Sequence, residues 1–350
     1  MTRVSTLAQN TLVTSYSLAT KTRMAETQVQ VASGMKSQRY SGIALDTSRL
    51  LNLEGQRDSA SSYIVSIKTV QTRVKLMTQG LTSLDDVASN IKSLVNNTRN
   101  TQAAFDVAIW TQADNALKQV QEVLNLQDDS GYLFAGARRD NAPVDTSYAT
   151  INGAAPFPAL PAGGPPPLTP AAPLSQAQID QIAAAYYSGA TTGADLSVRT
   201  SDNTTPIDYG LKGNEEAFKN LIAGLHMIRQ ANVRYPSPAT SSADIDQAYL
   251  DNGMELITKA ISGEATTNYP TVVEGLRSLA GTLAGTNGTL GRSLEQHTSF
   301  VAYTEVAIAD IEQVDTAEAV VRLNSDQVAL QAAFSTLAQL QEITLLNYLR

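Results

Sequence analysis

The stretch that decides the fold is Leu53–Val95, which reads LEGQRDSASSYIVSIKTVQTRVKLMTQGLTSLDDVASNIKSLV. Alternate steps of three and four residues along it meet an apolar side chain everywhere except at Gln56. The positions reached are Leu53, Gln56, Ala60, Tyr63, Ile67, Val70, Val74, Met77, Leu81, Leu84, Ala88, Ile91 and Val95. This heptad spacing predicts one amphipathic helix, which at 1.5 Å per residue is about 63 Å long. A helix of that length does not fit a compact globular domain.

Other segments repeat the helical spacing. A second heptad stripe near the C-terminus, with two polar interruptions, consists of Leu290, Leu294, His297, Val301, Thr304, Ile308 and Ile311. The two stripes are natural partners in an antiparallel bundle. Shorter apolar repeats predict further helices over residues 109–124, 218–228 and 250–261.

Proline separates the two ends of the chain from its middle. Nine of the 13 prolines fall within residues 143–173, and none lies in 1–142 or 271–350. Because a proline inside a helix removes a hydrogen bond and clashes with the preceding turn, long helices belong to the two ends. In the middle, β-branched residues over 191–199 and 204–209 predict short strands and hairpins.

These patterns predict a mainly α fold, an elongated antiparallel helical bundle built from both chain ends with a smaller inserted β-containing domain. We expect a terminal-helix domain from residues 1–40 and 305–350 and a helical core domain from 41–136 and 213–304. Residues 137–212 are the expected variable insert, which is rich in Pro and Gly.

The two chain ends differ in charge. Residues 1–40 hold five basic side chains and one acidic one, whereas residues 305–350 hold two basic and seven acidic ones. Opposite charge favours pairing of the terminal helices, but each exposed ion pair contributes only about 0–1 kcal/mol, and two separately solvated faces are an equal alternative. The N-terminal helix also lacks a single clean apolar stripe, which suits either a helix with several neighbours or a frayed terminus.

The composition argues against enzymatic chemistry. The chain has no Cys, which excludes disulfides, thiolate catalysis and Cys-bound metals. The two histidines, His226 and His297, are interpreted as packing or surface residues, so we expect neither a metal nor a cofactor. Adjacent acids such as Asp128 and Asp129 lie near predicted helix ends, where capping or solvation explains them.

A glycine cluster near the second heptad stripe invites comparison with a phosphate-binding loop. Its members are Gly281, Gly285, Gly288 and Gly291. The cluster lacks the Lys and Ser/Thr that end such a loop and follows no predicted strand, so we interpret it as a turn between helices.

Charge and hydropathy exclude other classes of partner. The formal net charge is −8 and the pI is about 4.9, so the chain lacks the clustered positive charge that nucleic acid binding requires. We expect a soluble protein, because no stretch approaches the roughly 18 consecutive apolar residues of a membrane span. Residues 1–20 do not resemble a secretory signal peptide, so any export would use another route.

Three segments carry a resemblance to a known family. Residues 131–144, GYLFAGARRDNAPV, are similar to a Gly-x-Tyr-Leu/Ile-Phe-Ser/Ala-Gly motif that ends a first helical core. Residues 329–349 are similar to a closing Leu-Gln/Glu-Ala-Ser/Ala-aromatic and Tyr-Leu pattern, and residues 30–36, QVASGMK, to a Ser-Gly-basic turn. The order of these motifs resembles the bacterial flagellin superfamily, most of all its hook-filament junction family, FlgL. Residues 40–44 depart from the family pattern.

The resemblance implies a structural role in motility rather than an enzymatic one. Members of the family leave the cell by flagellar type III export, are secreted to the extracellular flagellum, and assemble by coiled-coil pairing of their terminal helices. The implied partners are further copies of the chain in a ring or tube, a neighbouring hook-associated protein, and flagellin, with no nucleic acid and no membrane. An export chaperone at the C-terminal helix is left open.

The resemblance and the terminal helices together give the expected assembly residues. These are Leu7, Leu12, Tyr16, Leu18, Leu330, Phe334, Leu337, Leu345 and Tyr348. The alternative within the superfamily is flagellin itself, the filament subunit. Two alternatives from other classes are a secreted enzyme with its activity in residues 145–212 and a cytoplasmic helical adaptor.

Overall fold

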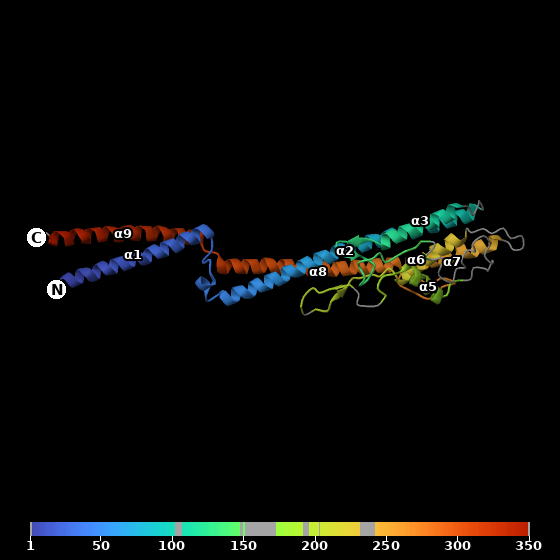
Figure 1. Cartoon of the computed structure of the whole chain (residues 1–350), viewed down its shortest axis with the longest axis horizontal. Coiled ribbons are helices and arrows are strands. Elements are labelled where there is room, and N and C mark those ends of the chain that lie inside the picture. The colour runs from blue at the N-terminus through green and yellow to red at the C-terminus, as the bar shows by residue number, and fades with distance from the viewer. Residues whose placement is uncertain are drawn as a thin grey trace. The chain divides into compact units, whose positions relative to one another are not determined.

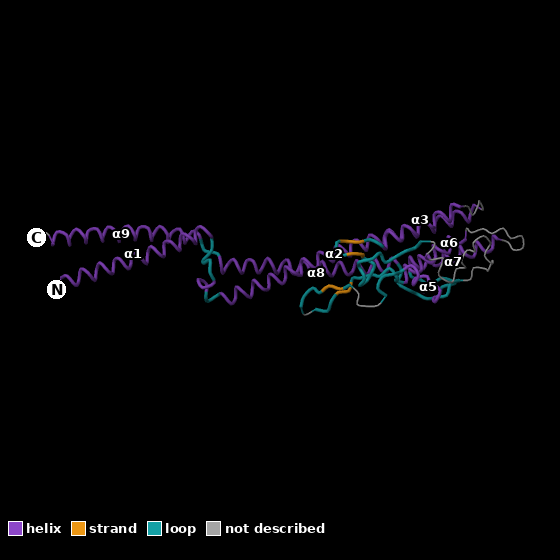
Figure 2. The backbone as a smooth tube through the Cα atoms, in the orientation of Figure 1, coloured by secondary structure: helices purple, strands orange, loops and turns teal. Residues whose placement is uncertain are grey.

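The computed structural model describes residues 2–101, 107–147, 150, 173–191, 196–202, 204–231 and 242–348. Its helices account for most of these residues, and its strands are short (Figure 2). The prediction of a mainly α fold with a small β component is therefore confirmed. The chain divides into two compact units: unit 1 comprises Met1–Ser61 and His297–Arg350, and unit 2 comprises Ser62–Gln296.

The helices are α1 (Thr2–Ser33), the 3-10 helix η1 (Tyr40–Ile43), α2 (Thr47–Thr101), α3 (Val107–Leu124), α5 (Gln176–Tyr186), α6 (Glu216–Ala231), α7 (Ser242–Ser262), α8 (Leu276–Glu312) and α9 (Thr316–Tyr348). The strands are β1 (Gln127–Asp128), β2 (Gly131–Tyr132), β3 (Ser197–Val198) and β4 (Ile207–Asp208). Strand β1 pairs antiparallel with β2, and β3 pairs antiparallel with β4.

The apolar stripe of α2 forms one side of the core of unit 2. Its side chains from Ile67 to Val95 are buried at the predicted heptad positions. They pack in one cluster with Leu117 of α3, Phe218 of α6 and Leu283 of α8. The helical periodicity of this segment is therefore satisfied by large apolar neighbours within the unit itself.

Helices α6 and α7 pack against each other in unit 2. A Cβ atom on Gly224 would lie 2.8 Å from the carbonyl oxygen of Gly253. A Cβ atom on Gly253 would likewise lie 2.8 Å from the carbonyl oxygen of Gly224. Only residues without a side chain allow the two backbones to approach this closely. The neighbouring Leu225 and Ile257 are fully buried, so close backbone approach and apolar burial act together.

The insert contains a helix that the sequence analysis missed. Helix α5 begins after Ser175, whose backbone N–H donates a hydrogen bond to the Gln178 side-chain oxygen at 2.8 Å, as in a capping box. Ile179, Ile182 and Tyr186 of α5 are buried in the core that α2 and α6 share. The predicted hairpin content is confirmed by β3 and β4. A separate domain over residues 137–212 stays a proposal.

The interpretation of the glycine cluster as a turn was wrong. Gly281, Gly285, Gly288 and Gly291 all lie within the continuous helix α8. Each glycine costs a helix about 1 kcal/mol relative to alanine. Burial of four leucines on the opposite side of the helix offsets that cost; they are Leu276, Leu279, Leu283 and Leu290. Tertiary packing therefore overrides the local preference for a turn.

Asp128 also has a different role from the predicted helix-end cap. It lies on strand β1, and its Oδ2 is 3.1 Å from Nε of Arg73 on α2. The Arg73 side chain is only 4% exposed. Asp128 therefore pairs with a buried positive charge and does not cap a helix end.

Candidate functional site

The terminal helices α1 and α9 lie side by side in unit 1, with both chain ends at the same end of the pair (Figure 1). Their less exposed side chains recur at heptad spacing and form what we term the seam. On α1 the seam consists of Val13, Ser17, Thr20, Met24, Thr27 and Val31, and on α9 of Ala319, Leu323, Asp326, Leu330, Ala333 and Leu337. Heptad spacing on both helices is the pattern of an antiparallel coiled coil.

The seam differs from an ordinary coiled-coil core in what it buries. Among the side chains described in α1 and α9, only Ser17, Thr27, Ala319 and Asp326 are buried. The leucines of the seam are half-buried. Three of the four buried residues are polar, so the apolar burial between these helices comes from side chains that are only partly covered.

An ion pair crosses the seam between Arg23 and Asp326. Nε of Arg23 lies 3.0 Å from both carboxylate oxygens of Asp326, and Nη2 of the same guanidinium also bonds the carboxylate. Asp326 is only 6% exposed, whereas the Arg23 side chain remains 62% exposed. The hydrogen bond from Arg23 lowers the pKa of Asp326 below its usual value. The same bond raises the pKa of Arg23, so both groups stay charged.

The outward sides of the pair carry large apolar side chains. Of the predicted assembly residues, Leu12 is 55% exposed, Tyr16 and Leu18 are each 66% exposed, and Phe334 is 55% exposed. Val29, Val320, Val321 and Val328 are exposed as well. Isolated apolar side chains at a surface are ordinary, but this helix pair exposes many bulky apolar groups while its fully buried positions are mainly polar or small.

The remaining predicted assembly residues fall into two groups. Leu330 and Leu337 are half-buried in the seam, so they contact α1 rather than facing outward. Leu7, Leu345 and Tyr348 lie in α1 or α9, but their side chains are outside the described residues. The structure thus places some of the expected residues outside and some inside the helix pair.

A backbone clamp closes the other end of the helix pair. It joins Gly34–Lys36 to Glu312–Val314: the Val314 N–H donates to the Gly34 carbonyl at 3.0 Å, and the Lys36 N–H donates to the Glu312 carbonyl at 2.6 Å. Met35 and Gln313 face each other between these bonds as an antiparallel bridge. Gly34 has φ +71°, a left-handed conformation that favours glycine and ends α1 after Ser33. This confirms the predicted Ser-Gly turn.

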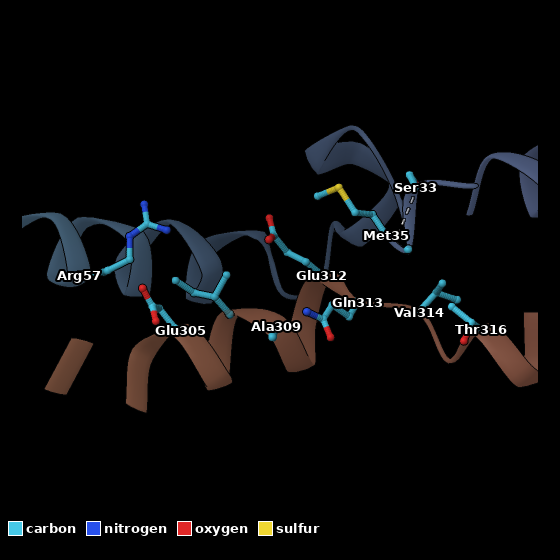
Figure 3. Close-up of a pocket in the computed structure, with 11 residues that line it drawn as sticks. Ser33, Met35, Arg57, Glu305, Ala309, Glu312, Gln313, Val314 and Thr316 are labelled. Atoms are coloured by element: carbon cyan, nitrogen blue, oxygen red, sulfur yellow. Dashed lines mark hydrogen bonds between the residues drawn. The ribbon is translucent and has the colours of Figure 1, made fainter. Parts of the chain in front are cut away.

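The clamp borders an open pocket of about 550 Å³ within unit 1. Figure 3 shows its side chains, with Arg57 and Glu305 on facing helices and Glu312 beside Met35. The hydrogen bond to Asp58, and then the negative charge of Asp58, raise the pKa of Arg57 most. The negative charge of Glu305 raises it further. The pocket is lined by charged and polar groups on an open face and has no nucleophile–base pair, which makes it a poor catalytic site.

The described part of the chain offers no group of three or more His, Asp or Glu side chains that could hold a metal ion. In unit 2, His226 is fully buried, with Nδ1 2.6 Å from Nη2 of Arg229. Burial, and then the Arg229 charge, lower its pKa well below the usual value. A histidine that stays neutral beside an arginine supports packing rather than proton transfer, as the sequence indicated. Within the described helices, none combines the length and apolarity needed to cross a bilayer.

Sequence reasoning missed the seam and its ion pair. The opposite charge of the two chain ends signalled pairing, but nothing in the totals singled out Arg23 or Asp326. The spacing did contain a signal, because Thr20, Met24 and Thr27 follow heptad spacing. Two of these residues are polar, so a search for apolar stripes does not detect the repeat.

Comparison with known proteins gives one family match. Residues 288–349 match the family model described as "Bacterial flagellin C-terminal helical region". This match confirms the resemblance to the flagellin superfamily over that segment, which covers α8 from residue 288 onward and all of α9. No match was found among the curated proteins.

Two solved structures match part of this chain. One is the crystal structure of FlgL from Bacillus cereus, with 15% sequence identity and a TM-score of 0.46; the match covers 76% of this chain and 99% of that one. The other is described as a flagellar hook-associated protein from Vibrio parahaemolyticus, with 14% identity and a TM-score of 0.47; the match covers 78% of this chain and 100% of that one.

Proposed function

We propose that this chain is a structural subunit of the bacterial flagellum that forms the junction between hook and filament by helix–helix assembly after type III export. The observation that carries the proposal is the exposed apolar surface of the terminal helix pair: α1 and α9 leave Leu12, Tyr16, Leu18 and Phe334 exposed and bury few apolar side chains fully. Such a pair gains its apolar burial from neighbouring subunits. The family match over residues 288–349 includes α9, one of the two helices of this pair.

The proposed partners follow from this surface. Further copies of the chain cover the outward apolar side chains in a ring or tube, and a hook-associated protein and flagellin lie on either side of it. Rings and tubes arise when one surface of a subunit binds a different surface of the next. The proposal includes secretion to the extracellular flagellum, no enzymatic activity, and a helix pair that is complete only in the assembly.

A deletion strain examined by electron microscopy tests this role. We expect bare hooks with flagellin released into the medium, because the filament would lack its attachment point. Normal filaments would overturn the proposal. The filament-subunit alternative is tested by seeding purified protein with filament fragments, since a flagellin would extend them into long filaments and a junction protein would not.

A point substitution tests the surface itself. Leu18→Ser combined with Phe334→Ser removes two outward apolar groups, and we expect a secreted, helical protein that no longer joins filament to hook. Val272→Ser is the matched control, because Val272 is 77% exposed but lies in unit 2. Equal motility of the two variants in soft agar would contradict the assignment of the surface.

Hydrogen exchange separates the proposal from a cytoplasmic helical adaptor. We expect faster amide exchange over α1 and α9 than over α6 in the purified monomer, because α1 and α9 bury little apolar surface. Strong protection of both terminal helices in the monomer would favour a self-sufficient adaptor.

A further inference from the structure

The seam between α1 and α9 contains little that fixes how far one helix slides along the other. In most coiled coils, large apolar side chains fill holes of matching shape, and a shift leaves them misplaced. Here the fully covered small side chains are Ser17, Thr27 and Ala319, which are nearly interchangeable in shape. The larger apolar side chains of the seam are only half-buried, so packing distinguishes weakly between registers.

The Arg23–Asp326 contact fits one register along the helices, the register that the backbone clamp at Gly34–Lys36 also fits at their end. It places Met24 level with Asp326, and the heptad repeat then aligns Ser17 with Ala333 and Val31 with Ala319 along the pair. The same register places two exposed apolar side chains, Tyr16 on α1 and Phe334 on α9, at one level of the pair. The alignment of the outward surface thus depends on the alignment of the seam.

Neighbouring registers separate Asp326 from Arg23. A shift of half a heptad puts the carboxylate level with Thr20, where Lys21 is the nearest base, or with Thr27, where Glu26 would repel it. A full heptad shift puts it level with Ser17 or Val31, where no basic residue stands directly beside it on α1. Because Asp326 is buried, each shifted register gives the carboxylate at most a single ammonium in place of the two-nitrogen contact of the guanidinium.

We propose that the Arg23–Asp326 ion pair sets the register of α1 against α9 and so positions Tyr16 and Phe334 at one level of the assembly surface. The inference rests on the proposed function only in taking the outward side of the pair as that surface. A polar contact inside a helix pair that specifies register at little gain in stability is a known device of coiled coils.

Spin-label distances measure the register directly. The chain has no Cys, so Ala32→Cys with Ala329→Cys adds one label on each helix at exposed positions outside the seam. The two sites differ by about 16 Å in level at 1.5 Å per residue, so a one-heptad shift changes their axial offset by about 10 Å. Double electron–electron resonance is recorded on the monomer and on assembled protein diluted with unlabelled chains.

We expect a single distance in the otherwise unchanged chain. Arg23→Gln should add a population shifted by about 5 or 10 Å, corresponding to half or one heptad. Asp326→Leu should do the same while keeping the helices, because a leucine there extends the apolar side of α9. The charge swap Arg23→Asp with Asp326→Arg should restore the single distance. Arg322→Gln is the matched control, since Arg322 and Glu318 form an exposed ion pair at 3.2 Å on α9 alone.

The outcomes divide cleanly. Shifted distances in both single variants, restored by the swap and absent from the control, support the proposal. An unchanged distance in both variants overturns it, as does a swap that restores nothing, a loss of helicity with no shifted population, or an unchanged chain without a defined distance in either state. Normal filaments in the deletion strain would overturn the flagellar role. The register measurement would remain valid in that case, because it does not depend on the role.

Discussion

Two helix pairs in this chain bury their contacts in opposite ways. Between α6 and α7, the backbones approach at Gly224 and Gly253, and large apolar side chains such as Leu225 and Ile257 are fully buried. Between α1 and α9, the fully buried groups are small or polar, the seam leucines are only half-buried, and other bulky apolar side chains are exposed. Helices α6 and α7 therefore bury their apolar contacts within the chain. Helices α1 and α9 are instead aligned by the Arg23–Asp326 ion pair and the backbone clamp.

The difference shows what each pair contributes. A buried leucine contributes roughly 2 kcal/mol through removal of its surface from water, so α6 and α7 stabilise unit 2 directly. In the terminal pair, we expect a neighbouring subunit to bury the exposed apolar side chains and so supply this hydrophobic stabilisation. Stability and assembly are thus carried by different helices.

The largest contrast should appear on truncating one leucine in each pair. Leu225→Ala removes a fully buried side chain from α6, and we expect a loss of about 2–5 kcal/mol in the free energy of unfolding. Leu18→Ala, at an exposed site on α1, should change the monomer by less than about 0.5 kcal/mol. Urea denaturation followed by circular dichroism measures both, and similar losses would erase the distinction between the pairs.

Adding a methyl group at the α6–α7 contact should also cost stability. The new Cβ of Gly224→Ala would lie 2.8 Å from the Gly253 carbonyl oxygen and 3.0 Å from Ile257 Cγ1. Relieving that overlap requires the helices to separate, and we expect a loss of about 1–3 kcal/mol in urea denaturation. Gly55→Ala in α2 serves as control, since nothing lies within 4 Å of its Cβ position. An unaffected Gly224 variant would mean that the helices part freely.

Unit 2 should lose stability in mild acid. Burial and the Arg229 charge lower the pKa of His226 in the folded protein, so the unfolded chain binds the extra proton below its ordinary pKa of 6.5. The contribution of neutral His226 to the free energy of unfolding is therefore fully present above that pH and is lost as the pH drops through it. Asp114, paired with Arg229 at 3.0 Å, and Lys118, paired with Asp114, are the other charges at this site.

Thermal melting between pH 7.5 and pH 5 tests this dependence. We expect the melting temperature of unit 2 to fall, and His226→Gln to flatten the decline. The Arg23–Asp326 pair should not respond in this window, because the pKa of Asp326 is lowered from 3.8 and its contribution is lost only in stronger acid. A decline that persists unchanged in the histidine variant would assign it to other groups.

The smallest effect should be a gain. Gly285 lies inside α8, and nothing approaches its Cβ position within 4 Å. Gly285→Ala should therefore raise the free energy of unfolding by about 0.4–1 kcal/mol, because the unfolded chain loses freedom and the helix gains propensity. A small upward shift of the melting temperature is the expected signal, and a decrease would contradict the open surroundings of this residue.

The helical framework could be predicted from the sequence because its determinants are local and periodic. The α2 stripe from Ile67 to Val95 is buried as its heptads predicted, and the predicted helices over 109–124, 218–228 and 250–261 are present. The start of α8 was not predictable in this way, because its glycines signal a turn and only the leucines beneath them decide otherwise. Helix α5 was predictable from Ser175 and Gln178 as a capping box, but the adjacent prolines obscured it.

The terminal pair was predictable only as a tendency. Opposite charges on the two ends indicated pairing, and Tyr16 and Phe334 were expected at an assembly surface, where the structure leaves both exposed. Leu330 and Leu337 were expected there too; the structure leaves them half-buried in the seam, and their part in assembly stays a prediction. Which of two helix sides faces a neighbour depends on the partner helix, and an amphipathic pattern with two weak sides does not contain that information.

The Arg23–Asp326 bond joins residues 303 positions apart, and this separation governs the order of folding. Contacts between distant residues form late, because the entropy of closing the intervening loop must be overcome first. Prior folding of unit 2 shortens that loop greatly. During synthesis, moreover, α1 leaves the ribosome before α9, so α1 stays without its partner helix until α9 has been made.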